Sequence, residues 1–191
     1  MGEFVKQPLL IGIAGRAGVG KDTAGRFLQL HYALSVAAFA DPLKAMLQAM
    51  GLTRSELDGP YKELPLRWLD ASPRRLLQTL GTEWGREMID PDLWLKVFGR
   101  KLAHDWQVLK DSDPDWAGYV ITDVRFENEA EFVRRRGHLV HLTRQAAPAV
   151  AAHSSESGLD IQTRDFLINN DGDLSQLHDA LTEVMRIINE R

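Results

Sequence analysis

A glycine-rich loop that directly follows an apolar run is the strongest constraint on the fold of this chain. The loop GRAGVGKDTAG starts at Gly15, after the apolar residues 8–15 and before a helical pattern. Between a buried strand and a helix, the spacing Gly-x-x-x-x-Gly-Lys turns backbone N–H groups inward around phosphate oxygens. The positive end of the helix and the ammonium of Lys21 add to this attraction. The residues expected to bind the phosphates of ATP are Gly15, Gly18, Val19, Gly20, Lys21, Asp22 and Thr23.

One position departs from the usual pattern, because Asp22 follows the lysine where Ser or Thr is usual. Thr23 lies on the same first helical turn, so its hydroxyl could contact a phosphate or a magnesium-bound water. Asp22 could hold the water shell of the cation, or it could only complement the positive end of the helix. The alternative for the whole loop is a glycine-rich turn that binds nothing. Its place between a strand and a helix argues against that alternative.

Strand-like and helix-like segments alternate along most of the chain. Strands are predicted at residues 8–15, 33–40, 118–125, 138–144 and 165–169, and the last helix at 174–189. A helix at 41–50 is predicted to begin with Asp41 as its cap. Such alternation implies a parallel sheet with helices on both faces. No strand is apparent in about 51–90, so the prediction is one domain over 1–191 with a helical insertion there.

Composition narrows the classes of protein. A formal net charge of −4 argues against binding nucleic acid by bulk electrostatics, and no apolar run approaches the length of a membrane span. The absence of cysteine excludes disulfides, thiolate metal sites and cysteine nucleophiles. No pair among the six histidines has a convincing metal spacing. We expect a cytoplasmic protein that binds neither nucleic acid nor membrane.

Polar residues follow two of the predicted strands. Asp123 ends one of them and Arg125 comes two residues later, at the edge where ligands bind in open α/β sheets. An acid in this place often positions magnesium beside a phosphate loop. Asp123 could instead cap the helix that follows. Asp41 ends the second strand in the same way, with Lys44 one turn into the next helix.

The predicted insertion carries a second set of polar side chains. Arg74 and Arg86 suit recognition of a second phosphate, since guanidinium groups bind phosphate with two hydrogen bonds. Gln78 and Thr82 lie between them in the sequence. The alternative for any single arginine is that it lies on a charged face exposed to solvent. We expect Arg75 to be such a solvent-exposed neighbour.

Six motifs occur in order and cover nearly the whole chain: GRAGVGKDTAG, FADPLK, SPRRLLQTLGTEWGREMID, VITDVRFENEAEF, HSSES and INNDG. Together they closely resemble the bacteriophage deoxynucleoside monophosphate kinases, a branch of the P-loop nucleoside monophosphate kinases. The resemblance implies a three-layer α/β/α fold with a five-stranded parallel sheet in the order 2-3-1-4-5. It also implies an acceptor-binding helical insertion, a lid, and magnesium-dependent transfer of the γ-phosphate of ATP to a deoxynucleoside monophosphate.

The resemblance also implies roles for individual residues. Gly-Lys-Asp-Thr is similar to Gly-Lys-Gly-Thr in adenylate kinases, where the threonine is also second after the lysine, so the departure marks a subfamily. TDVR resembles the Asp-Gly-x-Pro-Arg element of other monophosphate kinases, in which the arginine binds the acceptor phosphate. The implied catalytic residues are Lys21, Asp123, Arg125 and Arg144, with Asp22, Thr23 and Asp123 near magnesium. The implied acceptor-binding residues are Asp41, Lys44, Arg74, Gln78, Thr82, Arg86 and Arg125. Arg144 and the loop at about 145–159 would form the lid.

Two other functions remain open at this level. One is another small-molecule P-loop kinase, similar to dephospho-coenzyme A kinase. The other is a nucleotide-binding protein without transfer activity that acts as a regulatory or scaffold partner. The expected partners are ATP and a deoxynucleoside monophosphate, in a monomer or homodimer, located in the host cytoplasm if a phage or prophage encodes it.

Overall fold

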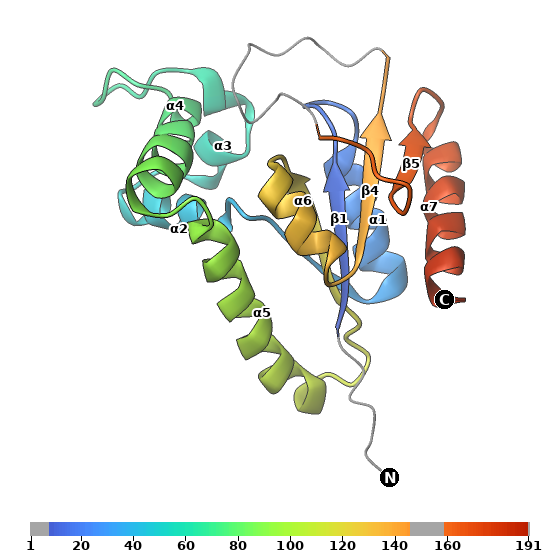
Figure 1. Cartoon of the computed structure of the whole chain (residues 1–191). Helices are drawn as coiled ribbons and strands as arrows, with labels where there is room; N and C mark the ends of the chain where they lie inside the picture. The colour runs from blue at the N-terminus through green and yellow to red at the C-terminus, as the bar shows by residue number, and fades with distance from the viewer. Residues whose placement is uncertain (1–7, 146–158, 191) are drawn as a thin grey trace. The chain divides into compact units, whose positions relative to one another are not determined.

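The structure is a computed structural model that describes residues 8–145 and 159–190 (Figure 1). The chain divides into two units, Met1–Ala38 with His104–Arg191, and Phe39–Ala103. The second unit contains the stretch 51–90 that was expected to form a helical insertion. None of the helices within the described residues is both long and apolar enough to cross a membrane.

A five-stranded parallel sheet forms the centre of the first unit. Its strands are β1 (Leu9–Ala14), β2 (Leu34–Ala37), β3 (Gly118–Val124), β4 (His138–Thr143) and β5 (Phe166–Asn169). Their order in the sheet is β2-β3-β1-β4-β5, and each neighbouring pair is parallel. The predicted α/β class and the strand order 2-3-1-4-5 are therefore confirmed. The carboxyl ends of all five strands meet at one edge.

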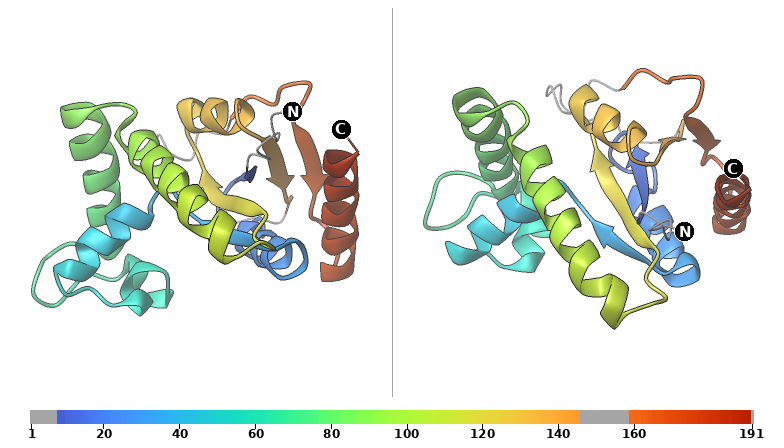
Figure 2. Two further views of the ribbon diagram at one scale, coloured as in Figure 1. Left: turned by 90° about the horizontal axis from the view of Figure 1, so that it is seen from below. Right: turned by 60° about the horizontal axis from the view of Figure 1, so that its bottom comes forward.

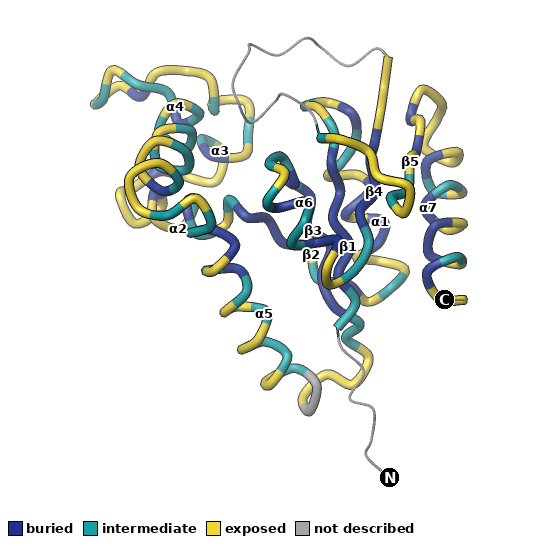
Figure 3. Tube along the Cα trace, viewed as in Figure 1, coloured by how far each residue is buried: buried dark blue, intermediate teal, exposed yellow. Residues whose placement is uncertain are grey.

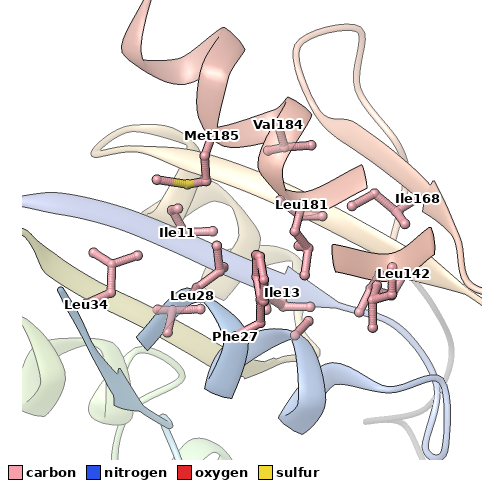
Figure 4. Packing of buried hydrophobic residues seen from close by; sticks show 14 of the residues in the cluster. Ile11, Ile13, Phe27, Leu28, Leu34, Leu142, Ile168, Leu181, Val184 and Met185 are labelled. Atoms are coloured by element: carbon pink, nitrogen blue, oxygen red, sulfur yellow. The ribbon is translucent and has the colours of Figure 1, made fainter. Parts of the chain in front are cut away.

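Helices cover both faces of this sheet (Figure 2). They are α1 (Lys21–Tyr32), α6 (Glu127–Arg134) and α7 (Leu174–Asn189). Ile11 and Ile13 of β1 pack in one cluster with buried side chains of α1 and α7 (Figure 4). Gly12 faces the other way, where an added Cβ would lie 2.9 Å from Val133 of α6. β1 is buried along almost its whole length (Figure 3), and its contacts on both faces are the reason for its continuous apolar sequence.

The second unit is helical. Its elements are α2 (Asp41–Ala49), α3 (Arg54–Leu57), the 3₁₀-helix η1 (Pro60–Glu63), α4 (Pro73–Gln78), the π-helix η2 (Thr79–Ile89) and the start of α5 (Leu93–Ser112). Leu47, Leu52, Leu57 and Leu66 form its small core. The prediction that Asp41 caps α2 is wrong, because Ala40 is the N-cap and Asp41 is already helical. Asp41 thus acts on the helix dipole from the first turn.

A buried ionic network joins α6 to β4 and to the segment before β5. Arg134 donates from Nε and Nη2 to the two carboxylate oxygens of Asp165, at 3.1 and 2.8 Å. Its Nη2 also donates to the Asp160 carbonyl at 2.7 Å. His141 Nε2 lies 3.0 Å from Asp165 Oδ2. Since the side chains of Arg134 and Asp165 are each only 1% exposed, this pair fixes α6 against the end of the sheet.

Two opposing effects set the pKa of Asp165. Desolvation by burial raises it, but hydrogen bonds from Arg134, the Gln162 N–H and His141 lower it by more. The folded-state pKa therefore lies below the ordinary value. Asp165 stabilises the fold fully above its unfolded pKa, and this stabilisation is lost as the pH falls through the lower folded value.

Replacement of Arg134 by methionine should lower the free energy of unfolding at pH 7 by about 3–5 kcal/mol, because it leaves the Asp165 carboxylate buried without its cation. Urea denaturation followed by circular dichroism measures this loss. The difference from the unchanged protein should shrink as the pH falls through the lowered folded-state pKa of Asp165, because the protonated side chain no longer needs the cation. Arg135→Met is the matched control, since that neighbouring side chain is 69% exposed. Equal losses in both variants would contradict the assignment.

Candidate functional site

The glycine loop between β1 and α1 has a backbone that only glycine adopts readily. Gly15, Gly18 and Gly20 have φ angles of 145°, 79° and 100°. At Gly15 a Cβ would also lie 2.4 Å from the Leu142 carbonyl oxygen. Gly20 is the N-cap of α1, and it makes no side-chain cap hydrogen bond. The start of α1 therefore presents backbone N–H groups of the kind that bind anions.

Lys21, the first residue of α1, folds back over this loop. Its Nζ donates to the carbonyl oxygens of Gly15 at 2.7 Å and Arg16 at 2.8 Å. The ammonium is thus held beside the loop amides. Asp22 and Thr23 follow on the same first turn, and both are exposed. This geometry supports the predicted phosphate loop and leaves both Asp22 and Thr23 accessible to a cation.

A cavity of about 310 Å³ opens at the carboxyl edge of the sheet beside the loop. Three arginines line it, namely Arg16 from the loop, Arg125 after β3 and Arg144 after β4. His141 and Thr143 of β4 also line it. The cavity therefore combines cationic groups with the glycine loop, and its chemistry suits an anionic ligand.

The end of β3 has an irregularity that the sequence pattern does not reveal. Gly12 pairs with Ile121, but Ala14 pairs with Val124, so β3 has one extra residue in this stretch. Such β-bulges re-aim side chains and are common beside active sites. The bulge lies in the stretch that contains Asp123. The partner strand there is β1, which leads directly into the glycine loop.

The alternative role of Asp123 as a helix cap is wrong. The N-cap of α6 is Phe126, three residues further along the chain. The carboxylate of Glu129 accepts hydrogen bonds from the N–H groups of Arg125 at 2.7 Å and Phe126 at 3.1 Å. Glu129 therefore serves the start of α6, and Asp123 lies near the carboxyl end of β3.

Asn170 supports the glycine loop, a role that the sequence analysis did not assign to it. It follows β5, is 7% exposed, and donates from Nδ2 to the Val19 carbonyl at 2.8 Å. Its own N–H donates to the Thr143 carbonyl at 2.8 Å. Asn170 thus ties the glycine loop to the ends of β4 and β5. The signal for it was the polar run INNDG at the carboxyl end of a strand.

The remaining predicted residues lie in the second unit. Lys44 pairs with Asp58 at 2.6 Å, and Arg74 forms an ion pair with Glu63. Arg86 donates to the Pro91 carbonyl at 3.0 Å. Arg74 and Gln78 belong to α4, Thr82 and Arg86 to the π-helix η2, and Asp41 begins α2. The structure therefore brings four of the six residues, Arg74, Gln78, Thr82 and Arg86, onto one continuous helical rod.

Some of the predicted residues have side chains of the kind that bind Mg²⁺. Residues 8–145 and 159–190 hold no cluster of three or more His, Asp or Glu side chains placed to bind a metal. Mg²⁺ keeps several waters and usually takes one or two carboxylates together with substrate phosphates. Asp22 and Thr23 carry hard oxygen donors of this kind on the first turn of α1, and Asp123 carries one near the end of β3. Of the predicted lid at about 145–159, residues 146–158 lie outside the described residues.

A family model and several related sequences point to one family. The family model for deoxynucleotide monophosphate kinase matches residues 67–181. A putative deoxynucleotide monophosphate kinase of Acanthamoeba polyphaga mimivirus is 31% identical over 182 residues, which cover 91% of this chain and 94% of that protein.

Two phage proteins match over a shorter stretch. The deoxynucleotide monophosphate kinase of Escherichia phage RB69 is 32% identical over 69% of this chain and 57% of its own length. The deoxynucleoside-5′-monophosphate kinase of Escherichia phage T5 is 38% identical over 56% of this chain and 43% of its own length. The chain thus spans about half the length of these phage relatives. With its sheet order, its glycine loop and these matches, the chain belongs to the deoxynucleotide monophosphate kinase family.

Proposed function

We propose that this protein transfers the γ-phosphate of ATP to a deoxynucleoside 5′-monophosphate and releases ADP and the deoxynucleoside diphosphate. The observation that carries the proposal is the glycine loop, with Lys21 folded over it, beside a cavity lined by Arg16, Arg125 and Arg144. Membership of the family adds the acceptor class. The proposed domain organisation is one kinase domain with a helical acceptor-binding insertion at about 51–90 and a lid at about 145–159.

The donor phosphates are assigned to the loop. Backbone N–H groups from Gly18 to Thr23 would donate hydrogen bonds to their oxygens. The positive end of the α1 dipole would add to the electrostatic attraction for the phosphates. Lys21 can exchange its two carbonyl partners for phosphate oxygens without leaving the loop. Asn170 keeps the loop in this conformation through its bond to the Val19 carbonyl.

The acceptor phosphate is assigned to Arg125, which lines the cavity at the end of β3. A guanidinium fixes a phosphate by two parallel hydrogen bonds, so it can orient the attacking oxygen as well as neutralise charge. Residues of the second unit would bind the rest of the acceptor: Asp41, Lys44, Arg74, Gln78, Thr82 and Arg86. Arg144 lines the same cavity and would act on charge that develops during transfer.

The chemical step needs little proton transfer from the protein. A nucleoside monophosphate is largely ionised at pH 7, because its second pKa is about 6, so its oxygen attacks without a general base. Positioning and electrostatic stabilisation then supply most of the rate acceleration. Asp123, Asp22 and Thr23 would hold Mg²⁺, directly or through its waters, and the cation would supply positive charge that neutralises part of the phosphate charge.

A panel of phosphate acceptors tests the proposed reaction. The full chain with ATP and Mg²⁺ should release ADP at least about 100-fold faster with one or more deoxynucleoside monophosphates than with water alone, because an oriented acceptor replaces random encounter. A coupled ADP assay measures this rate. Acceleration only by dephospho-coenzyme A would show a different small-molecule kinase. Bound ATP without turnover would leave a regulatory or scaffold role.

Replacement of Lys21 by alanine should lower kcat by about 100-fold or more, since it removes a positive charge from the transferring phosphate. The fold should remain, as checked by thermal melting. Arg26→Ala on the exposed side of the same helix is the control, and its kcat should stay within about twofold. Near-normal turnover of Lys21→Ala would mean that the phosphate site lies elsewhere.

Two isosteric variants separate the roles of the carboxylates. Asp123→Asn should raise the Mg²⁺ concentration for half-maximal activity by about tenfold, because it removes a carboxylate from the cation or its water shell. Asp22→Asn should change this concentration by less than about twofold if Asp22 only complements the helix dipole. Activity measured across a magnesium titration gives both values. The reverse order would assign the water shell to Asp22.

A further inference from the structure

The π-helix η2 is unusual in its length. It runs for 11 residues, Thr79–Ile89, directly after α4. At its end the N–H of Asp90 bonds to the carbonyl of Gly85 at 3.0 Å, which is the five-residue spacing of a π-helix. Most π-helices are single-turn bulges inside α-helices, and many of these lie at functional sites. A stretch of this length therefore needs a structural cause.

Trp94 is buried against this helix and contacts it at two glycines. Its indole Nε1 donates to the Gly81 carbonyl at 2.8 Å, and the residue is 4% exposed. Its ring lies against Gly85, where an added Cβ would be 2.5 Å from Cζ2 of Trp94. A side chain that bonds into the backbone of a helix disturbs the regular four-residue ladder. Gly85 leaves the room for the ring, and Gly81 provides the carbonyl.

The wider helix changes which side chains share a face. An α-helix turns by about 100° per residue, whereas a π-helix with about 4.4 residues per turn advances by about 82°. In an unbroken α-helix, Arg74 and Arg86 would lie about 120° apart around the axis. With the change to π geometry after Gln78, the two positions come within about 25° of each other. Arg74, Gln78, Thr82 and Arg86 then form one row.

We propose that Trp94 is a positioning residue that holds η2 in π geometry and so aligns Arg74, Gln78, Thr82 and Arg86 as one face for the acceptor nucleotide. This inference rests on the proposed function. The row has a guanidinium at each end and an amide and a hydroxyl between them. Guanidinium groups bind phosphate, while the amide and hydroxyl can donate to and accept from a base or sugar.

The test compares Trp94→Phe with Trp84→Phe. Trp84 is the matched control, because its ring lies 6.3 Å from that of Trp94 and it is 37% exposed. Trp94→Phe keeps an aromatic ring but loses the N–H that Gly81 accepts. It should raise KM for the deoxynucleoside monophosphate at least about tenfold, with the Kd for ATP unchanged within about twofold. Trp84→Phe should change neither value by more than about twofold.

Hydrogen exchange gives a readout independent of activity. The Trp94 indole N–H of the unchanged protein should exchange slowly, and the Asp90 amide should lose protection in Trp94→Phe. Rapid exchange of that indole in the unchanged protein would overturn the inference even if Trp94→Phe failed to fold.

Arg86→Ala separates this inference from the proposed function. It should raise KM for the acceptor, and Trp94→Phe added to it should cause little further increase, because both changes remove the same contact. An unchanged KM in Arg86→Ala would remove this residue from acceptor binding and overturn both the row and its assigned role. An effect of Arg86→Ala with none of Trp94→Phe would overturn only the role of Trp94.

Discussion

The position of β1 between β3 and β4 is the constraint on which the first unit depends. Because all three strands are parallel, their carboxyl ends meet where the chain must turn from β1 into α1. At Gly15 this turn passes so close to β4 that an added Cβ would lie only 2.4 Å from the Leu142 carbonyl oxygen. Arg125 and Arg144 come directly after β3 and β4, so the same meeting of strand ends brings them to the cavity at the loop. Strand order and anion site are thus consequences of one pairing.

Local patterns in the sequence predicted most of this unit. The apolar run before Gly15 identifies β1, since a strand buried on both faces has no polar alternation. The spacing of Leu177, Leu181, Val184 and Ile188 predicts α7, which the structure gives as Leu174–Asn189, in agreement with the expected 174–189. The family resemblance supplied the strand order, which alternation alone does not determine. The places of Lys21 at the glycine loop and of Arg125 after β3 could therefore be predicted from the sequence.

Features that depend on distant contacts could not be predicted in this way. Asn170 acts on Val19, and these residues are 151 positions apart in the chain. Arg134 was recognisable only as a basic residue near a helix end, although its partner Asp165 comes from the segment before β5. The π geometry of η2 depends on Trp94, which lies beyond the helix itself. Hydrophobic periodicity describes one element at a time and contains no information about such pairs.

The resting place of Lys21 has a further consequence for how an anion would be received. Its ammonium already bonds to the Gly15 and Arg16 carbonyls, so the long side chain has lost much of its rotamer freedom before any ligand arrives. Capture of a phosphate then becomes a change of partners by an ordered cation, and little additional conformational entropy is lost. The same two carbonyls compete with the phosphate, which favours release of the product anion. The loop is thus suited to repeated exchange of ligands more than to the tightest possible retention of one.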